Sequence, residues 1–250
     1  MRKLLAVVYG VAAYATGLLT LLYFIGFSGN VFVPKTVDVG AGAPAGEAWI
    51  IDVLLVALFG LQHSVMARPA FKARWTRVVP PAMERSVYVL SASIALMILF
   101  LGWRPIDTII WNISNPVATG LIWFLFWAGW AMVLISTFLI NHFELFGLQQ
   151  AWLNLRGKEA AKPELRQPLF YRWVAHPLYS GFFLAFWATP EMTAGHLLLA
   201  TGMSVYMLIG IRHEERDMGD MFGDEYRRYR AGVGGLFPRF GRRKESGSAA

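Results

Sequence analysis

The amino-acid sequence predicts an all-α, polytopic helical membrane protein with about six (five to six) spans. Of its 250 residues, 56% are hydrophobic and only 16% are charged, whereas an ordinary globular domain has about 45–50% apolar and about 25% charged residues. The apolar residues also occur in runs close to the roughly 20 residues that a helix needs to cross the hydrocarbon core of a bilayer. A soluble fold could not bury this much apolar surface.

Six apolar segments are candidate spans: 4–27, 49–66, 86–102, 117–140, 169–188 and 196–211. The fifth contains Arg172 and His176 and the sixth is short, so both are weaker candidates than the other four. Thr189-Pro190-Glu191 between them predicts a turn, so the two segments are expected to form a tight helical hairpin. The first segment is long for a signal peptide and no clear A-x-A site lies immediately beyond it, so it is expected to remain as a span.

The positions of the basic residues predict the orientation of these spans. With six spans and a cytoplasmic N-terminus, every Lys and Arg except Lys35 and Arg104 falls in a cytoplasmic segment, as the positive-inside rule requires. We therefore expect a multi-pass protein of the bacterial inner (cytoplasmic) membrane with both termini in the cytoplasm. Topology and contact with anionic membrane lipid then explain the net charge of +7, which does not indicate nucleic-acid binding.

The chain has no cysteine, which excludes disulfides, cysteine-ligated zinc, iron–sulfur clusters and a cysteine nucleophile. No metal site is expected. Residues 241–250 are polar and of low complexity, so they are expected to form a disordered tail.

Polar side chains near the cytoplasmic ends of the spans are candidates for chemistry, because polar groups at membrane depth usually face a cavity or a partner. Gln62-His63-Ser64 ends the second span, and Glu84, Arg85 and Tyr88 enter the third. Residues 141–150 place five hydrogen-bonding side chains where the fourth span emerges. Each group has a simpler explanation: a polar helix end among lipid headgroups, charges that orient a helix, or an amphipathic interfacial helix.

The strongest candidates lie in two blocks beside the last two predicted spans. In residues 174–181, His176-Pro177 is expected to begin a helix, because proline suits a first helical turn. In residues 212–229, Glu214 and Glu215 follow the last span beside several arginines. Such charged segments are, taken alone, more often solvated surface than ligand sites.

These two blocks carry a family resemblance. His176-Pro177-x-Tyr179-x-Gly181 and Glu214-Glu215-x-x-Met218-x-x-x-Phe222-Gly223-x-x-Tyr226-x-x-Tyr229 resemble the isoprenylcysteine carboxyl methyltransferase and phospholipid methyltransferase superfamily, over about the last 80 residues. That family reads R-H-P-x-Y-x-G and then E-E-x-x-L-x-x-x-F-G-x-x-Y-x-x-Y. Ala175 replaces the arginine and Met218 the leucine, so one polar contact of the family is missing.

Three segments earlier in the chain sharpen the resemblance: 62–69, 84–88 and 141–148. They are similar to the methanethiol S-methyltransferases, bacterial membrane enzymes that convert methanethiol to dimethyl sulfide, and the first is also shared with NnrU-like proteins. The resemblance implies one membrane-embedded methyltransferase domain over residues 1–240, with S-adenosylmethionine as cofactor and the cofactor-binding part at about 169–240.

The resemblance also implies which residues form the site. The residues expected to bind the cofactor are His176, Pro177, Tyr179, Glu214, Glu215, Phe222, Tyr226 and Tyr229, to which Tyr171 and Arg212 are added because they lie nearby in the sequence. The residues expected to contact the thiol substrate are Glu84, Arg85, Tyr88 and Phe146.

A thiol acceptor must react as the thiolate, and a simple alkanethiol titrates above the ~8.5 of cysteine, so a nearby base would help at neutral pH. His63 and His142 are the candidate bases, with Glu144 orienting the base or sharing the proton.

Two alternatives remain open at this point. The acceptor could be a prenylcysteine carboxylate or a phospholipid amine, either of which would need a wide opening towards lipid. In a different class, histidines at several helix ends could bind haem or another metal in a redox or sensor protein. Haem ligation would not explain the Glu-Glu and Phe-Gly-x-x-Tyr-x-x-Tyr block.

Overall fold

The computed structural model of the protein describes residues 1–159, 164–165 and 167–239. Its long helices are α1 (Arg2–Gly29), α2 (Ala45–Ala67), α4 (Pro81–Gly102), α5 (Pro116–Ile140) and α9 (Ala194–Phe222). Its shorter helices are α3 (Pro69–Trp75), α6 (His142–Leu145), α7 (Leu148–Arg156), the 3-10 helix η1 (Leu169–Arg172), α8 (Pro177–Trp187) and α10 (Asp224–Gly232). The predicted disordered tail at 241–250 lies outside the described residues.

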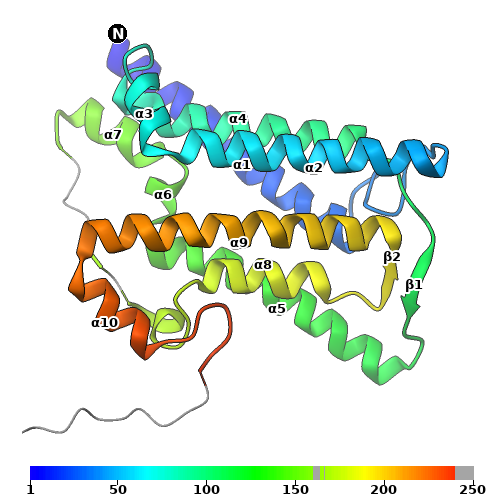
Figure 1. Ribbon diagram of the computed structural model, residues 1–250. Helices are drawn as coiled ribbons and strands as arrows, with labels where there is room; N and C mark the ends of the chain where they lie inside the picture. Colours follow the sequence, from blue (N-terminus) through cyan, green and yellow to red (C-terminus); the bar gives the residue numbers. More distant parts are fainter. Residues whose placement is uncertain (160–163, 166, 240–250) are drawn as a thin grey trace, which may run out of the picture.

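The five long helices confirm the predicted class of polytopic helical membrane protein. Each is 22 to 29 residues long with an apolar window of mean hydropathy 1.6 to 1.9, enough to cross a bilayer. They run side by side along the length of the molecule (Figure 1). Large apolar side chains such as Leu58, Leu101 and Phe124 are exposed on their outer faces, which suits contact with lipid rather than water.

The segment predicted as a fifth full span, 169–188, is not one continuous helix. Its first residues form η1, and α8 begins only at Pro177 and has 11 residues. At a rise of 1.5 Å per residue α8 is about 16 Å long, roughly half the thickness of the hydrocarbon core. The prediction was wrong because apolar composition does not reveal where a helix starts, whereas His176-Pro177 does.

Beyond α8 the chain continues in an extended conformation. After α8 it continues into β2 (Glu191–Thr193), which pairs antiparallel with β1 (Ile109–Asn112). Thr189-Pro190-Glu191 therefore leads into a strand pairing that was not predicted. α9 then runs back through the bundle, so that α10 lies at the same end of the molecule as the N-terminus (Figure 1).

A polar cluster at the opposite end of the bundle contains Lys35 and Arg104, the two basic residues that fall outside the predicted cytoplasmic segments. Asp52 is fully buried, and its Oδ1 accepts a hydrogen bond from the backbone N–H of Arg104 at 2.9 Å. Lys35 also interacts with the Asp52 charge and donates from Nζ to the carbonyl oxygen of Leu101. Lys35 and Arg104 thus offset a buried carboxylate there, which would be costly unpaired.

The closest helix packing joins α5 to α8 and depends on two glycines. A Cβ on Gly129 would lie 2.7 Å from the carbonyl oxygen of Gly181, and a Cβ on Gly181 would lie 2.7 Å from the carbonyl oxygen of Gly129. Real side chains do not approach backbone this closely, so the two helices touch backbone to backbone. This contact fixes the short helix α8, which carries His176 at its start, against a full-length span.

We expect Gly181→Ala to destabilise the protein, because its methyl group would meet backbone atoms of Gly129 and Val133 that cannot move aside. Overpacking of this kind typically costs about 1–3 kcal/mol. Gly120→Ala on α5 is the control, since a Cβ there would meet nothing within 4 Å. Thermal unfolding of purified protein in detergent, followed by circular dichroism, measures both. Equal unfolding temperatures for the two variants would contradict the packing argument.

Candidate functional site

The bundle encloses two adjoining chambers at the end that holds the N-terminus and α10. The larger one, here called the inner chamber, has a volume of about 590 Å³ and is lined from α1, α2, α4, α5, α8 and α9. The smaller one, the outer chamber, has a volume of about 400 Å³ and is lined by the end of α5, by α7 and by residues around α9 and α10. The residues that line both chambers are Ile140, Tyr171, Ala175, His176, Glu214, Met218 and Met221.

The shared wall centres on His176, whose ring is buried at the start of α8. Its Nε2 lies 3.1 Å from Oε1 of Glu215, and Glu215 also accepts a hydrogen bond from Nε of Arg230. Its Nδ1 lies 3.8 Å from Oε1 of Glu214, too far for a hydrogen bond, and has no hydrogen-bond partner among the residues that the structure describes. The protein therefore satisfies one ring nitrogen, whereas the other is buried and unpaired among the described residues.

The two carboxylates also set the charge of His176. Burial lowers the pKa of His176, but the negative charges of Glu214 and Glu215, together with the hydrogen bond to Glu215, outweigh burial, and the pKa is raised above its ordinary value. The side chain of Glu215 is engaged by His176 and Arg230, whereas that of Glu214 is 46% exposed and lines both chambers. Glu214 is thus the carboxylate available to a ligand.

Aromatic side chains form much of the outer chamber. Tyr171, Phe222, Tyr226 and Tyr229 all line it. The hydroxyl of Tyr229 donates to the carbonyl oxygen of Tyr171 at 2.9 Å, which ties α10 to η1. Burial raises the pKa of both Tyr226 and Tyr229 to about 12, so both remain neutral phenols. The chamber combines flat aromatic surfaces with the exposed carboxylates of Glu144, Glu164 and Glu214, a combination that suits a ligand with a planar ring and a positive charge.

The polar end of the inner chamber is built around His63 of α2. Its Nε2 lies 2.6 Å from the hydroxyl of Tyr88 on α4, and its Nδ1 is buried and has no hydrogen-bond partner in the described part of the chain. The guanidinium of Arg85 lies 4.9 Å from the centre of the Tyr88 ring and donates from Nε to the carbonyl oxygen of Leu145 at 2.8 Å. Tyr206 of α9 meets the His63 ring edge-on at 5.8 Å.

The other end of the inner chamber lies deeper in the bundle and is apolar. It is lined by Leu21, Phe24, Phe59, Leu96, Val133, Phe186 and Met203. Along α4, Tyr88, Ala92 and Leu96 all line the chamber at four-residue spacing, so they lie on one helical face and span about 12 Å. The chamber therefore changes from polar to apolar along its length.

His142, predicted as a catalytic base, lines neither chamber. It is 3% exposed, the Tyr14 hydroxyl lies 3.0 Å from its Nε2, and Thr137 Oγ1 lies 2.8 Å from its Nδ1. Its ring stacks on Phe138 with centroids 4.1 Å apart, and burial lowers its pKa. With both nitrogens engaged, His142 is placed to hold α6 against α1 and α5.

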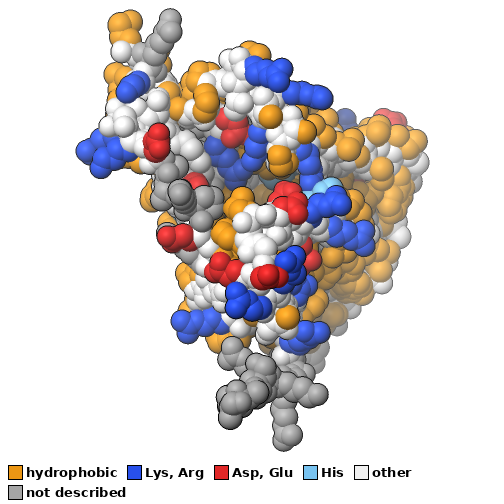
Figure 2. Space-filling view, turned by 60° about the vertical axis from the view of Figure 1, so that its left-hand side comes forward, with side chains coloured by type: hydrophobic (Ala, Val, Ile, Leu, Met, Phe, Trp, Pro, Cys, Tyr) orange, Lys and Arg blue, Asp and Glu red, His pale blue; other side chains and the backbone are white. Residues whose placement is uncertain are grey.

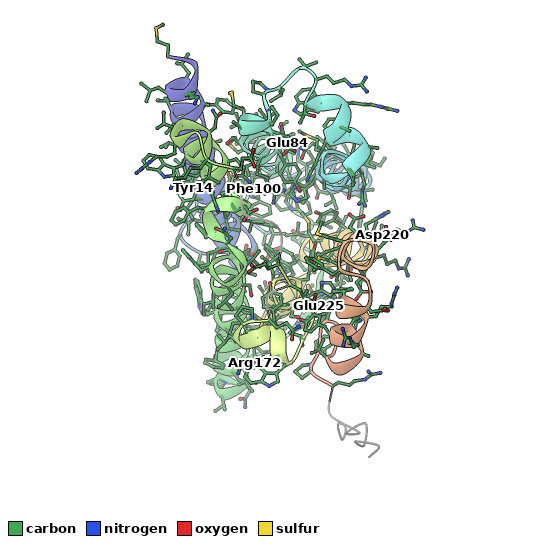
Figure 3. All side chains as sticks on the ribbon, turned by 90° about the vertical axis from the view of Figure 1, so that its left-hand side faces the viewer. Tyr14, Glu84, Phe100, Arg172, Asp220 and Glu225 are labelled. Carbon is green, nitrogen blue, oxygen red and sulfur yellow. The ribbon has the colours of Figure 1, made fainter. Side chains whose placement is uncertain are left out.

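The other predicted site residues do not all lie at the same chamber. Glu144 is exposed and lines the outer chamber, where it accepts a hydrogen bond from the amide of Asn141 at 2.9 Å. Glu84 and Arg212 line neither chamber; Figure 3 looks onto this end of the bundle and labels Glu84 at the start of α4. Phe146 and Tyr179 line the inner chamber, whereas Pro177 and Glu215 support the site from behind the wall.

Several residues of the inner chamber were not among the predicted site residues: Ser64, Arg68, Tyr206, His213 and Asp217. Tyr206 could have been found, because it lies two helical turns before Glu214 and so shares its face of the helix. The others follow only once α2, α4 and α9 are packed together. No three His, Asp or Glu side chains of the described residues gather as a metal site would require.

The surface around the chambers is charged. Figure 2 shows Lys and Arg side chains, with Asp and Glu among them, spread over this end of the molecule and hydrophobic side chains covering its flank. Arg68 and Arg85 also line the inner chamber. The chambers therefore open where the bundle meets water, at the end that carries the predicted cytoplasmic charges.

Comparison with known proteins gives a consistent family. A family model described as NnrU protein matches residues 53–235. The methanethiol S-methyltransferase of Mycobacterium tuberculosis is 50% identical over 95% of this chain and 98% of its own length. Methanethiol S-methyltransferase 1 of Bradyrhizobium diazoefficiens is 51% identical over 94% of this chain and 83% of its own length. Nurim of Danio rerio is 31% identical over 68% of this chain and 65% of its own length.

No solved structure matches the chain. The two methanethiol S-methyltransferases match 94–95% of this chain, so the match includes the long helices and the segments that line the chambers. The chain belongs to the NnrU family and, within it, to the methanethiol S-methyltransferases.

Proposed function

We propose that the protein transfers a methyl group from S-adenosylmethionine to methanethiol, giving dimethyl sulfide. The single observation that carries the proposal is the wall shared by the two chambers. A polar, aromatic chamber suits the methyl donor, and an apolar chamber suits a small volatile thiol. The relatives named methanethiol S-methyltransferase support the same reaction.

The residues of the outer chamber fit S-adenosylmethionine. Glu214 would hold a hydroxyl or a positively charged group of the cofactor, and the unpartnered Nδ1 of the buried His176 would meet a polar atom. Tyr171, Tyr226 and Tyr229 offer the aromatic faces on which an adenine ring or a sulfonium can rest. When bound, the cofactor supplies a methyl group on a positively charged sulfur, which leaves as a neutral thioether.

In the inner chamber, we infer that His63 takes the thiol proton. Tyr88 holds Nε2 of His63 at 2.6 Å, and in the tautomer with the proton on Nε2 the free Nδ1 is a base. The walls of the inner chamber would hold the resulting thiolate in line with the methyl group that the bound cofactor would supply. Because opposite charges cancel in this step, apolar walls that exclude water favour it.

The orientation in the membrane follows from the same proposal. A soluble cofactor must reach the outer chamber from the aqueous side, and the chambers lie at the end that carries most of the Lys and Arg residues. By the positive-inside rule that end faces the cytoplasm. We infer an inner-membrane protein of bacteria with both termini in the cytoplasm.

The reaction is tested by headspace gas chromatography over the purified protein in detergent, supplied with S-adenosylmethionine and methanethiol. We expect dimethyl sulfide to form in step with S-adenosylhomocysteine. If calorimetry detects cofactor binding but no dimethyl sulfide forms, the methyl acceptor is wrong.

Glu214→Gln should weaken cofactor binding at least tenfold, because it removes the exposed carboxylate of the shared wall while keeping its shape. A lost hydrogen bond to a charged group is worth about 1.5–3 kcal/mol. Isothermal titration calorimetry with S-adenosylmethionine measures the change. Glu225→Gln is the matched control, since Glu225 is an exposed residue of α10 that lines neither chamber (labelled in Figure 3). Equal affinity in the two variants would remove Glu214 from the site.

His63→Ala should lower kcat by about 10²-fold or more, the usual contribution of a general base, with cofactor affinity unchanged. His142→Ala should mainly lower the unfolding temperature, because it breaks the hydrogen bonds to Tyr14 and Thr137. Turnover per folded molecule and thermal unfolding, measured on both variants, separate the two roles. The larger kcat loss in His142→Ala would reverse the assignment.

A further inference from the structure

We propose that the protein also S-methylates aliphatic thiols with longer apolar chains, with the sulfur at the polar end of the inner chamber and the tail in its deep end. This inference rests on the proposed function and extends its substrate class. The products would be alkyl methyl sulfides.

The first argument is size. Methanethiol has two heavy atoms, whereas the inner chamber measures about 590 Å³, within the range of about 300–1,000 Å³ that accommodates drug-sized ligands. The outer chamber has a separate volume of about 400 Å³ with its own polar and aromatic lining. The deep end of the inner chamber is therefore left for the acceptor.

The second argument is the polarity of the deep end. Apart from hydroxyl groups, its lining carries aliphatic and aromatic side chains. The hydroxyls of Thr20 and Ser93 donate to the carbonyl oxygens of Thr16 and Val89, one turn earlier in their own helices. Because these hydroxyl groups already have hydrogen-bond partners, the deep end suits a ligand with an apolar surface.

The third argument is the direction of the chamber. His63 and Tyr88 mark the polar end, Leu96 lies in the deep end, and Ala92 lies between them on the same face of α4. A thiol whose sulfur faces His63 therefore points its tail past the small side chain of Ala92. Ala92 has a methyl group where a larger residue would divide the chamber.

The chemistry is the same as for methanethiol. The thiol loses its proton, its sulfur forms a bond to the methyl carbon, and the carbon–sulfur bond of S-adenosylmethionine breaks with its electron pair on the leaving sulfur. One alkanethiol and one cofactor thus give one alkyl methyl sulfide, S-adenosylhomocysteine and one proton. Each buried methylene favours binding by about fourfold, until the deep end is full.

The experiment compares methanethiol with butanethiol in protein reconstituted into lipid nanodiscs, with products measured by gas chromatography and mass spectrometry. We expect butyl methyl sulfide to form with a kcat/KM at least equal to that for methanethiol. Ala92→Leu should lower the butanethiol-to-methanethiol ratio of kcat/KM at least tenfold. Ala57→Leu, an identical change on the exposed face of α2, should leave the ratio unaltered. Ratios within one membrane preparation cancel the partitioning of thiols into lipid.

Methylation of methanethiol without methylation of butanethiol overturns this inference and leaves the proposed function intact. An unaltered ratio in Ala92→Leu overturns it as well. If neither thiol is methylated although calorimetry detects cofactor binding, the proposed function itself fails. Should Ala92→Leu not fold, product inhibition of the wild-type protein tests the inference instead. We expect the inhibition constant of butyl methyl sulfide to be lower than that of ethyl methyl sulfide, because its chain has two more methylenes. Equal inhibition constants would exclude an apolar tail site.

Discussion

The contact between His176 and Glu215 holds the site together, because three separate segments meet there. His176 begins α8, Glu215 lies on α9, and Arg230 of α10 completes the group. Backbone hydrogen bonds reinforce it: the N–H of Ala175 donates to the carbonyl oxygen of Gly234 at 2.8 Å. Together with the hydrogen bond from Tyr229 to Tyr171, this junction fixes α10 as one wall of the outer chamber.

The same junction explains why α8 is short. A helix that continued through residues 169–176 would carry His176 in its interior, where Pro177 cannot follow without breaking the hydrogen-bond ladder. Starting at Pro177 instead leaves the N–H groups of the first turn free and puts His176 between the two chambers. The loss of a full span thus creates the polar wall that the proposed methyl transfer needs.

The sequence alone predicted the fold class and the four clear spans, because a span is recognised from the length and apolar composition of one continuous segment. It also singled out two polar residues of the shared wall, since His176 and Glu214 belong to a family motif, but not Ile140 or Met221. It could not rank His63 above His142. That distinction depends on Tyr14, which lies 128 residues from His142 in the chain and occupies one of its nitrogens.

The backbone contact at Gly129 and Gly181 has a consequence for how relatives of this protein could diverge. Neither glycine tolerates a side chain, so α5 and α8 form a rigid plate on one side of the inner chamber. A change in helix spacing that alters the chamber must therefore come from the facing helices, where small residues such as Ala92 and Gly210 line the cavity. Acceptor preference in this family is therefore expected to vary with the positions of α4 and α9 and with the side chains that line the chamber, while the backbones of α5 and α8 keep their spacing.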